Sequence, residues 1–205
     1  MNRLTLLFFV LALAVPAAGA QDVQLRAFGG RTAPLAQDAD IFSRSYKGGI
    51  TLGMGGRVAA SERVSLDIVL SYQRFDLRRA ATILENNLGV DGTGAQFRES
   101  SPYNMLALET SLQFTLSPST PIRPYAIGGL VNKVEFAEEI RVEGPRGTFG
   151  TRRGRTQYYS AAVQVGLGVH TRLAARVGLF AEGLVNMDIR ARHSYPLRVG
   201  LTVEL

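Results

Sequence analysis

The chain has 205 residues, a formal net charge of +6 and no cysteine. The length suits a single domain, and the lack of cysteine excludes disulfide bonds and thiolate metal sites. Lys47 and Lys133 are the only lysines, so the positive charge is carried by arginine. The arginines form no single stripe of the kind that binds nucleic acid, and we expect no nucleic-acid partner.

The N-terminal segment has the pattern of a secretory signal peptide. Arg3 precedes an apolar run at residues 4–15, and the small residues 18–20 provide a cleavage site. The apolar run is shorter than the roughly 20 residues that a helix needs to span a bilayer. We predict that residues 1–20 are a signal peptide and that residues 21–205 form the exported domain.

The exported domain contains segments in which apolar and polar residues alternate. Alternation puts apolar side chains on one face of a strand and polar side chains on the other, which is the signature of strands in a membrane barrel. In chain order the eight segments are residues 22–30, 48–60, 63–75, 103–116, 123–134, 157–171, 176–189 and 195–205. The last segment has an unbroken apolar face, which is typical of the closing strand of an outer-membrane barrel: Tyr195, Leu197, Val199, Leu201, Val203 and Leu205.

The fifth segment is the least regular, and we expect Tyr125, Ile127 and Val131 to face outward. The connections between segments alternate in length, with long ones at residues 31–47, 76–102 and 135–156. Short periplasmic turns and longer external loops are the arrangement of a membrane barrel. Most tyrosines fall at strand ends beside the long connections, as expected of rings that prefer the membrane interface.

The polar face decides between a membrane barrel and a soluble one. A lipocalin would have its apolar face inside and its polar face in water. The polar face of residues 157–171 consists mainly of small side chains, glutamine and histidine, which suits a crowded lining better than a water-facing surface. We therefore predict that the apolar face contacts lipid and the polar face lines the lumen.

Charges of both signs lie on the predicted lumen face. They are Arg26, Arg57, Asp67, Glu109, Glu182, Arg198 and Glu204, with His170 nearby. Eight strands leave an interior just wide enough for side chains, and an unpaired buried charge is costly. We expect Asp67 and Glu109 to pair with Arg26, Arg57 or Arg198 and to plug the lumen, with a proton or ion path as the alternative.

The sequence resembles a known family in four features. They are the signal peptide, the alternating segments, the Arg-Pro-Tyr-Ala-Ile-Gly-Gly sequence at residues 123–129 and the apolar last strand. The family is the small outer-membrane β-barrel domain family, which includes the outer membrane protein A transmembrane domain and the outer membrane protein X type. The resemblance implies an all-β, eight-stranded antiparallel up-and-down transmembrane barrel located in the outer membrane. Its implied partners are outer-membrane lipid, lipopolysaccharide and the barrel-assembly machinery, and a monomer is favoured. Leu205 departs from the phenylalanine that usually ends the family's chains.

The sequence offers little support for catalysis. His170 and His193 are the only histidines, and Ser194 next to His193 would point to the opposite face of a strand. The glycine-rich residues 53–56 lie within a strand rather than before a helix, so we read them as relief of crowding on the inner wall. No group of residues has metal-ligand spacing. We expect no catalytic, cofactor or metal site.

A charged loop carries the remaining functional signal. The arginines that could bind lipopolysaccharide phosphates are Arg146, Arg152, Arg153 and Arg155. A guanidinium binds phosphate through two parallel hydrogen bonds, although charged loops often serve solubility alone. The sequence favours an outer-membrane protein with a structural or surface-interaction role. A narrow porin-like channel and a lipid A-modifying barrel enzyme are the alternatives.

Overall fold

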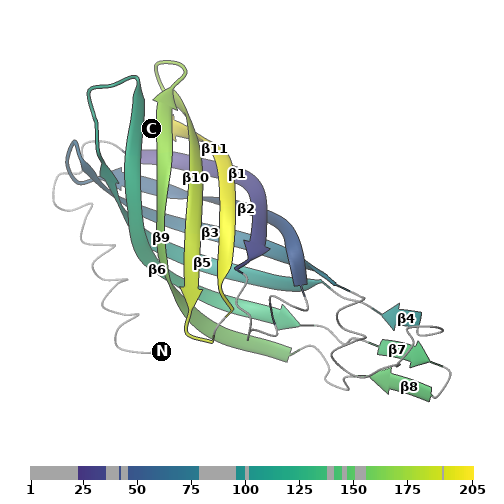
Figure 1. Cartoon of the computed structure of the whole chain (residues 1–205). Helices are drawn as coiled ribbons and strands as arrows, with labels where there is room; N and C mark the ends of the chain where they lie inside the picture. The colour runs from purple at the N-terminus through teal and green to yellow at the C-terminus, as the bar shows by residue number, and fades with distance from the viewer. Residues whose placement is uncertain are drawn as a thin grey trace.

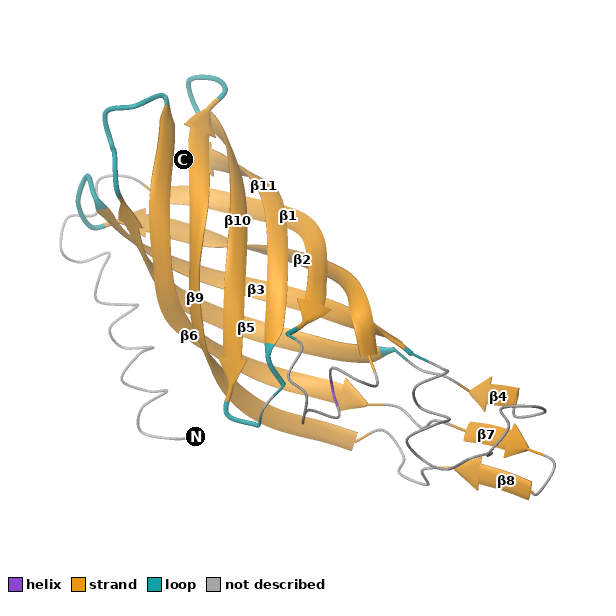
Figure 2. Ribbon diagram, viewed as in Figure 1, coloured by secondary structure: helices purple, strands orange, loops and turns teal. Residues whose placement is uncertain are grey.

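A computed structural model describes residues 23–35, 42, 46–78, 96–99, 102–137, 141–144, 147–150, 156–190 and 192–205. Eight strands form one closed antiparallel barrel (Figures 1 and 2). They are β1 (Val23–Pro34), β2 (Tyr46–Ala59), β3 (Val64–Leu77), β5 (Tyr103–Thr115), β6 (Ile122–Ala137), β9 (Thr156–Arg172), β10 (Val177–Asp188) and β11 (Ser194–Glu204). Residues 1–20, which carry the predicted signal peptide, lie outside the described residues.

Three further strands form a separate sheet. They are β4 (Gln96–Glu99), β7 (Arg141–Gly144) and β8 (Gly147–Gly150), in the order β4-β7-β8. This sheet joins two of the long connections and lies beyond one end of the barrel (Figure 1). These strands leave no recognisable pattern in the sequence, because four-residue segments are too short to show alternation.

The barrel closes by pairing its first strand with its last. Each barrel strand pairs with its neighbour in the chain, and β11 returns to β1 in a register that runs from Gln24↔Glu204 to Pro34↔Ser194. Closure leaves no unpaired sheet edge, which is what a sheet needs in lipid. We call the end with Val23, Leu205 and the short connections the turn end, and the opposite end the loop end.

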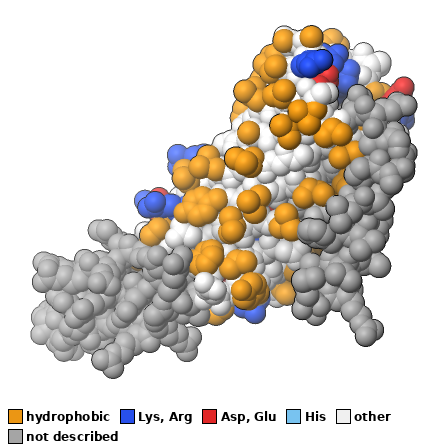
Figure 3. Space-filling model, turned by 180° about the vertical axis from the view of Figure 1, so that it is seen from behind, with side chains coloured by type: hydrophobic (Ala, Val, Ile, Leu, Met, Phe, Trp, Pro, Cys, Tyr) orange, Lys and Arg blue, Asp and Glu red, His pale blue; other side chains and the backbone are white. Residues whose placement is uncertain are grey.

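Alternate burial along the strands separates an outward face from a lumen face. On β11 the odd-numbered side chains from Tyr195 to Val203 are exposed and the even-numbered ones from Ser194 to Thr202 are buried. Figure 3 shows hydrophobic side chains spread over the visible barrel wall, with charged side chains mainly near its margins. An apolar outward band of this kind is what a transmembrane barrel presents to lipid. In the part of the chain that the structure describes, no helix is long and apolar enough to cross a membrane.

The structure corrects the face assignment of the fifth predicted strand, which is β6. Tyr125, Ile127 and Val131 were expected to face outward, but their exposed fractions are 1%, 6% and 0%. Lys133 and Glu135 also stand at odd-numbered positions of this strand, and both are buried. Since both charged side chains find polar partners in the lumen, they fix which face of β6 points inward. The outward face is made by the alternating set Pro124, Ala126, Gly128, Leu130, Asn132 and Val134.

Glycines on the lumen wall make room for aromatic rings. A Cβ atom on Gly53 would lie 2.4 Å from Cζ of Phe28, and one on Gly168 would lie 2.5 Å from ring atoms of Tyr125. Real Cβ atoms do not approach so closely, so each ring occupies the space that a side chain larger than glycine would need. The close approach at Gly53 agrees with the interpretation of residues 53–56 as relief of crowding.

Candidate functional site: the polar lumen

Buried polar and charged side chains lie in the described lumen in three layers. From the turn end towards the loop end, the layers are centred on Asp67, on Glu109 and on Asp188. We name them the Asp67, Glu109 and Asp188 layers. Each contains at least one buried ion pair, and the layers follow one another because inward positions recur every second residue along a strand.

The Asp67 layer neutralises two arginines with two carboxylates. Arg57 and Asp67 are opposite each other on β2 and β3, and Arg57 donates to Asp67 from Nε at 2.7 Å and from Nη2 at 3.0 Å. Arg26 donates from Nη1 to Asp67 and from Nη2 to Glu182 at 2.5 Å. The Tyr125 hydroxyl donates to Glu182 at 2.9 Å. All five side chains are buried, so the charges are compensated within the layer.

The Glu109 layer is a carboxylate surrounded by donors. Arg198 binds Glu109 through two hydrogen bonds, Nη1 to Oε2 at 2.7 Å and Nη2 to Oε1 at 2.6 Å. Ser71 and Gln164 also donate to this carboxylate, and Gln164 donates in addition to Asn186. A bidentate guanidinium–carboxylate pair is stronger and more directional than a single contact. The layer therefore holds its side chains in one defined arrangement.

The Asp188 layer lies near the loop end. Lys133 Nζ donates to Asp188 Oδ2 at 2.9 Å, and neither side chain has exposed area. Ser160 Oγ is within hydrogen-bond distance of both Glu135 and Asp188, at 2.8 Å and 3.0 Å. The Tyr103 hydroxyl donates a hydrogen bond to Glu135 at 2.5 Å. This layer joins four strands, β5, β6, β9 and β10.

An arginine from the last connection covers the Asp188 layer. Arg192 pairs with Glu135, and its guanidinium lies 5.0 Å from the ring centroid of Tyr158. Burial alone would lower the pKa of Arg192, but the nearby Tyr103 and Glu135 raise it above the ordinary value for arginine. Arg192 therefore remains a cation at the loop end of the lumen.

Aromatic rings fill the space between the two layers nearest the turn end. Phe28 and Phe180 meet edge to face, with ring centroids 6.4 Å apart. The guanidinium of Arg26 lies 4.2 Å from the Phe180 ring centroid, and that of Arg198 lies 4.5 Å from the Phe28 ring centroid. Both distances suit cation–π attraction. The rings therefore pack against both charged layers where the lumen would otherwise be open.

The structure brings together all but one of the charges predicted for the lumen. Arg26, Arg57, Asp67 and Glu182 share one layer, and Glu109 and Arg198 form the next. Glu204 lies apart at the turn end, where it pairs with Arg172 at 2.6 Å and both side chains are partly exposed.

Sequence reasoning missed the charges of the Asp188 layer: Lys133, Glu135 and Asp188. Two of them lie on β6, whose faces the sequence analysis inverted. Lys133 and Glu135 stand at odd-numbered positions, as Tyr125 does. These two charges were the signal in the sequence that could have identified the odd-numbered face of this strand as the lumen face.

Neither histidine is placed to activate an accessible nucleophile. His170 Nε2 lies 3.1 Å from Thr202 Oγ1, but the Thr202 side chain is buried. His193 Nδ1 accepts a hydrogen bond from the backbone N–H of Asp188 at 3.0 Å, and the adjacent Ser194 is fully buried. Covalent catalysis needs a nucleophile that substrate can reach. Among the described residues, no group of three or more potential ligands could hold a metal ion.

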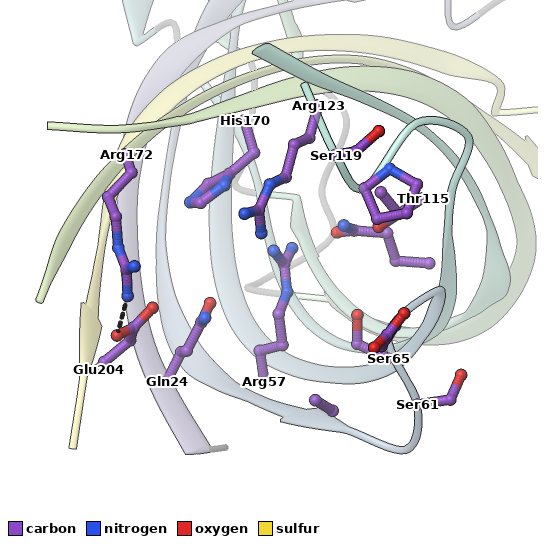
Figure 4. Close-up of a pocket in the computed structure, with 14 residues that line it drawn as sticks. Gln24, Arg57, Ser61, Ser65, Thr115, Ser119, Arg123, His170, Arg172 and Glu204 are labelled. Atoms are coloured by element: carbon purple, nitrogen blue, oxygen red, sulfur yellow. Dashed lines mark hydrogen bonds and ion pairs between the residues drawn. The ribbon is translucent and has the colours of Figure 1, made fainter. Parts of the chain in front are cut away.

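Beyond the Asp67 layer the lumen opens into a pocket of about 520 Å³ at the turn end. Its wall includes Arg57, Arg123, His170 and Arg172, whose side chains project into the barrel mouth (Figure 4). The arrangement is a closed barrel with three layers of buried polar side chains and a polar mouth.

Comparisons with known proteins agree with this architecture. No family model and no curated protein sequence matches the chain. The N-terminal β-barrel domain of Pseudomonas aeruginosa OprF is similar in structure, with a TM-score of 0.51, 13% identity, and coverage of 90% of this chain and 97% of that one. Neisserial surface protein A has a TM-score of 0.52, 12% identity, and coverage of 89% and 97%.

The closed eight-stranded barrel, its apolar outward band and the likeness to these two solved structures agree on the fold of the chain. The chain has the fold of a small outer-membrane β-barrel, as the sequence predicted. The fold and the apolar band account for an outer-membrane location, because a closed barrel satisfies every backbone polar group in lipid.

Proposed function

We propose that this protein is an integral outer-membrane barrel whose lumen is closed and whose role, structural or surface interaction, is carried by its loops. The observation that supports the proposal is the set of three buried layers that fill the lumen. A lumen closed by these layers leaves the loops and the two open ends of the barrel as the parts of the molecule that can meet other molecules.

The ion pairs cross the lumen instead of lining it. In the order of strands around the barrel, β11 and β5 lie on opposite sides, and Arg198 and Glu109 span this distance. Arg26 reaches from β1 to β3 on one side and to β10 on the other. Separating a buried pair leaves an uncompensated charge, which is strongly unfavourable. The layers therefore favour a plug over a narrow channel or a proton path.

Single-channel recording of the refolded protein in a planar bilayer tests the plug. We expect little or no conductance from the unmodified chain. The double variant Glu109→Ala and Arg198→Ala should conduct more, because it removes both ends of a contact across the lumen. The matched control removes the exposed pair Arg74 and Asp76, which lies 3.7 Å apart near the loop end. A large, stable conductance from the unmodified protein would instead support the narrow-channel alternative.

We further propose that the arginines of the loop before β9 contact lipopolysaccharide. Arg146, Arg152, Arg153 and Arg155 lie outside the described residues, so the support is their charge and their place on the long-loop side of the barrel. Arg146 stands between β7 and β8 in the chain.

Binding to purified lipopolysaccharide tests this contact. The triple variant Arg152→Gln, Arg153→Gln and Arg155→Gln should fold normally and bind more weakly. The difference should shrink as salt is added, because exposed charge contacts are screened. Arg63→Gln with Arg176→Gln removes exposed charge from the turn end and serves as the control. Equal binding by the triple variant would assign the loop arginines to solubility.

Export and assembly complete the proposal. Residues 1–20 act as a signal peptide, the barrel-assembly machinery inserts the domain, and the inserted protein is a monomer without enzymatic activity. N-terminal sequencing of protein recovered from outer membranes should start at Gln21. Recovery of the uncleaved chain would show that residues 1–20 act as a membrane anchor and not as a signal peptide.

A further inference from the structure

The turn end of the lumen is hollow, whereas side chains fill the lumen above it. The pocket there has a volume of about 520 Å³. At about 30 Å³ for each water molecule, it has room for more than ten molecules of that size. We call it the turn-end cup, and Figure 4 shows side chains from several strands and two short turns projecting into it.

The arginines of the turn-end cup are not equally neutralised. Arg172 donates to Glu204 at 2.6 Å, and Arg57 uses Nε and Nη2 for Asp67. Arg123 has no carboxylate partner among the described residues, and its guanidinium faces that of Arg57 across the cup (Figure 4). Like charges that face each other repel, and an anion between them turns this repulsion into attraction.

Neutral hydrogen-bonding groups surround the two facing arginines. The hydroxyls that line the cup belong to Ser61, Ser65, Thr115 and Ser119. Gln24 and Gln113 also line it, and the side-chain oxygen of each is buried without a partner. An amide carries both an acceptor and an N–H₂ donor, so either glutamine can turn a donor towards an anion. The cup thus combines the guanidinium fork of Arg123 and the remaining N–H groups of Arg57 with hydroxyl and amide groups.

We propose that the turn-end cup binds the phosphate group of a small soluble molecule, held between Arg57 and Arg123. The planar fork of arginine matches phosphate oxygens with paired hydrogen bonds, and hydroxyls complete the shell. The carboxylates of Glu62 and Glu204 also line the cup, which disfavours a large polyanion. The cup lies inside the barrel mouth, away from the lipid-facing wall, so its ligand arrives through water. The site shares Arg57 with the Asp67 layer and does not depend on the loops.

Calorimetric titration of the refolded protein in detergent with inorganic phosphate tests the proposal. We expect saturable binding by the unmodified protein. Arg123→Gln should weaken it by about tenfold, the equivalent of about 1.4 kcal/mol. The matched control is Arg176→Gln, which removes an exposed arginine from a turn at the same end but outside the cup. The control should bind phosphate within about twofold of the unmodified protein, a shift well below one tenfold step in affinity.

Three results would overturn the proposal. The first is the absence of saturable phosphate binding. The second is an equal loss in the Arg123→Gln and Arg176→Gln variants, which would show diffuse charge instead of a site. The third is binding of short-chain phosphatidic acid without binding of inorganic phosphate, which would identify a lipid headgroup as the ligand. Both variants replace exposed side chains, so gel mobility before and after heating checks that each barrel has folded.

Discussion

Asp67 neutralises two arginines in the lumen, and its side chain is almost completely buried. Asp67→Asn would remove one of the two carboxylates that neutralise Arg26 and Arg57, and only Glu182 would remain. Removing one partner of a buried ion pair typically costs about 3–5 kcal/mol, and we expect a loss of this size in the free energy of unfolding. Urea titration of the protein in lipid vesicles measures it.

Asp76→Asn is the control for this prediction. Asp76 pairs with Arg74 at 3.7 Å near the loop end, and about half of each side chain is exposed. An exposed pair of this kind contributes about 0–1 kcal/mol. Similar losses in the two variants would mean that the Asp67 layer does not stabilise the barrel through its charges.

Gly168 supports the ring of Tyr125, whose hydroxyl donates to Glu182 in the Asp67 layer. Gly168→Ala would place Cβ 2.5 Å from ring atoms. We expect a destabilisation of about 1–3 kcal/mol, as for overpacking elsewhere. Gly128→Ala, where no atom lies within 4 Å of the new Cβ, should be neutral or gain about 0.5–1 kcal/mol. The same urea titration compares the two, and an equal effect would rule out the steric explanation.

At the scale of strands, β11 has two functions, since it presents an apolar face to lipid and closes the sheet. Leu201 pairs with Ala27 of β1 and with Leu179 of β10, whereas Leu205 lies at the turn end. An arginine facing lipid costs about 2–4 kcal/mol at the bilayer midplane and much less near an interface. We expect Leu201→Arg to reduce folded protein in outer-membrane fractions more than Leu205→Arg does.

Deleting residues 201–205 should be worse than either substitution. The deletion removes the partners of residues 24–27 on β1 and leaves an open edge in lipid, where unpaired backbone groups cannot bond to water. Normal folding of the shortened chain would show that β11 does not close the barrel.

At the scale of the whole molecule, all barrel strands belong to one hydrogen-bonded ring. A ring without edges opens only by breaking a complete strand pair, so detergent at room temperature should leave it folded. We therefore expect the protein to fractionate with outer membranes and to change its gel mobility on heating. The measurement is electrophoresis with and without boiling, and recovery as a soluble periplasmic protein would support the lipocalin interpretation instead.

The strands and most of their faces can be predicted from the sequence, because alternation is a local property. Each inward or outward position follows from its neighbour two residues away, and the predicted boundaries lie close to the observed ones except that β1 continues to Pro34. Alternation failed for β6, where the inward residues Tyr125, Ile127 and Val131 are as apolar as the outward ones.

Which charges meet depends on the way the barrel closes, and this cannot be read from any one strand. Arg198 and Glu109 are 89 positions apart in the chain, and they pair because barrel closure puts β11 opposite β5. Asp188 meets Lys133 for the same reason, as β10 and β6 flank β9 around the ring. The alternation of side chains between the two faces is set within each strand. Contacts across the lumen depend instead on the register of every strand pair that lies between the two partners around the barrel.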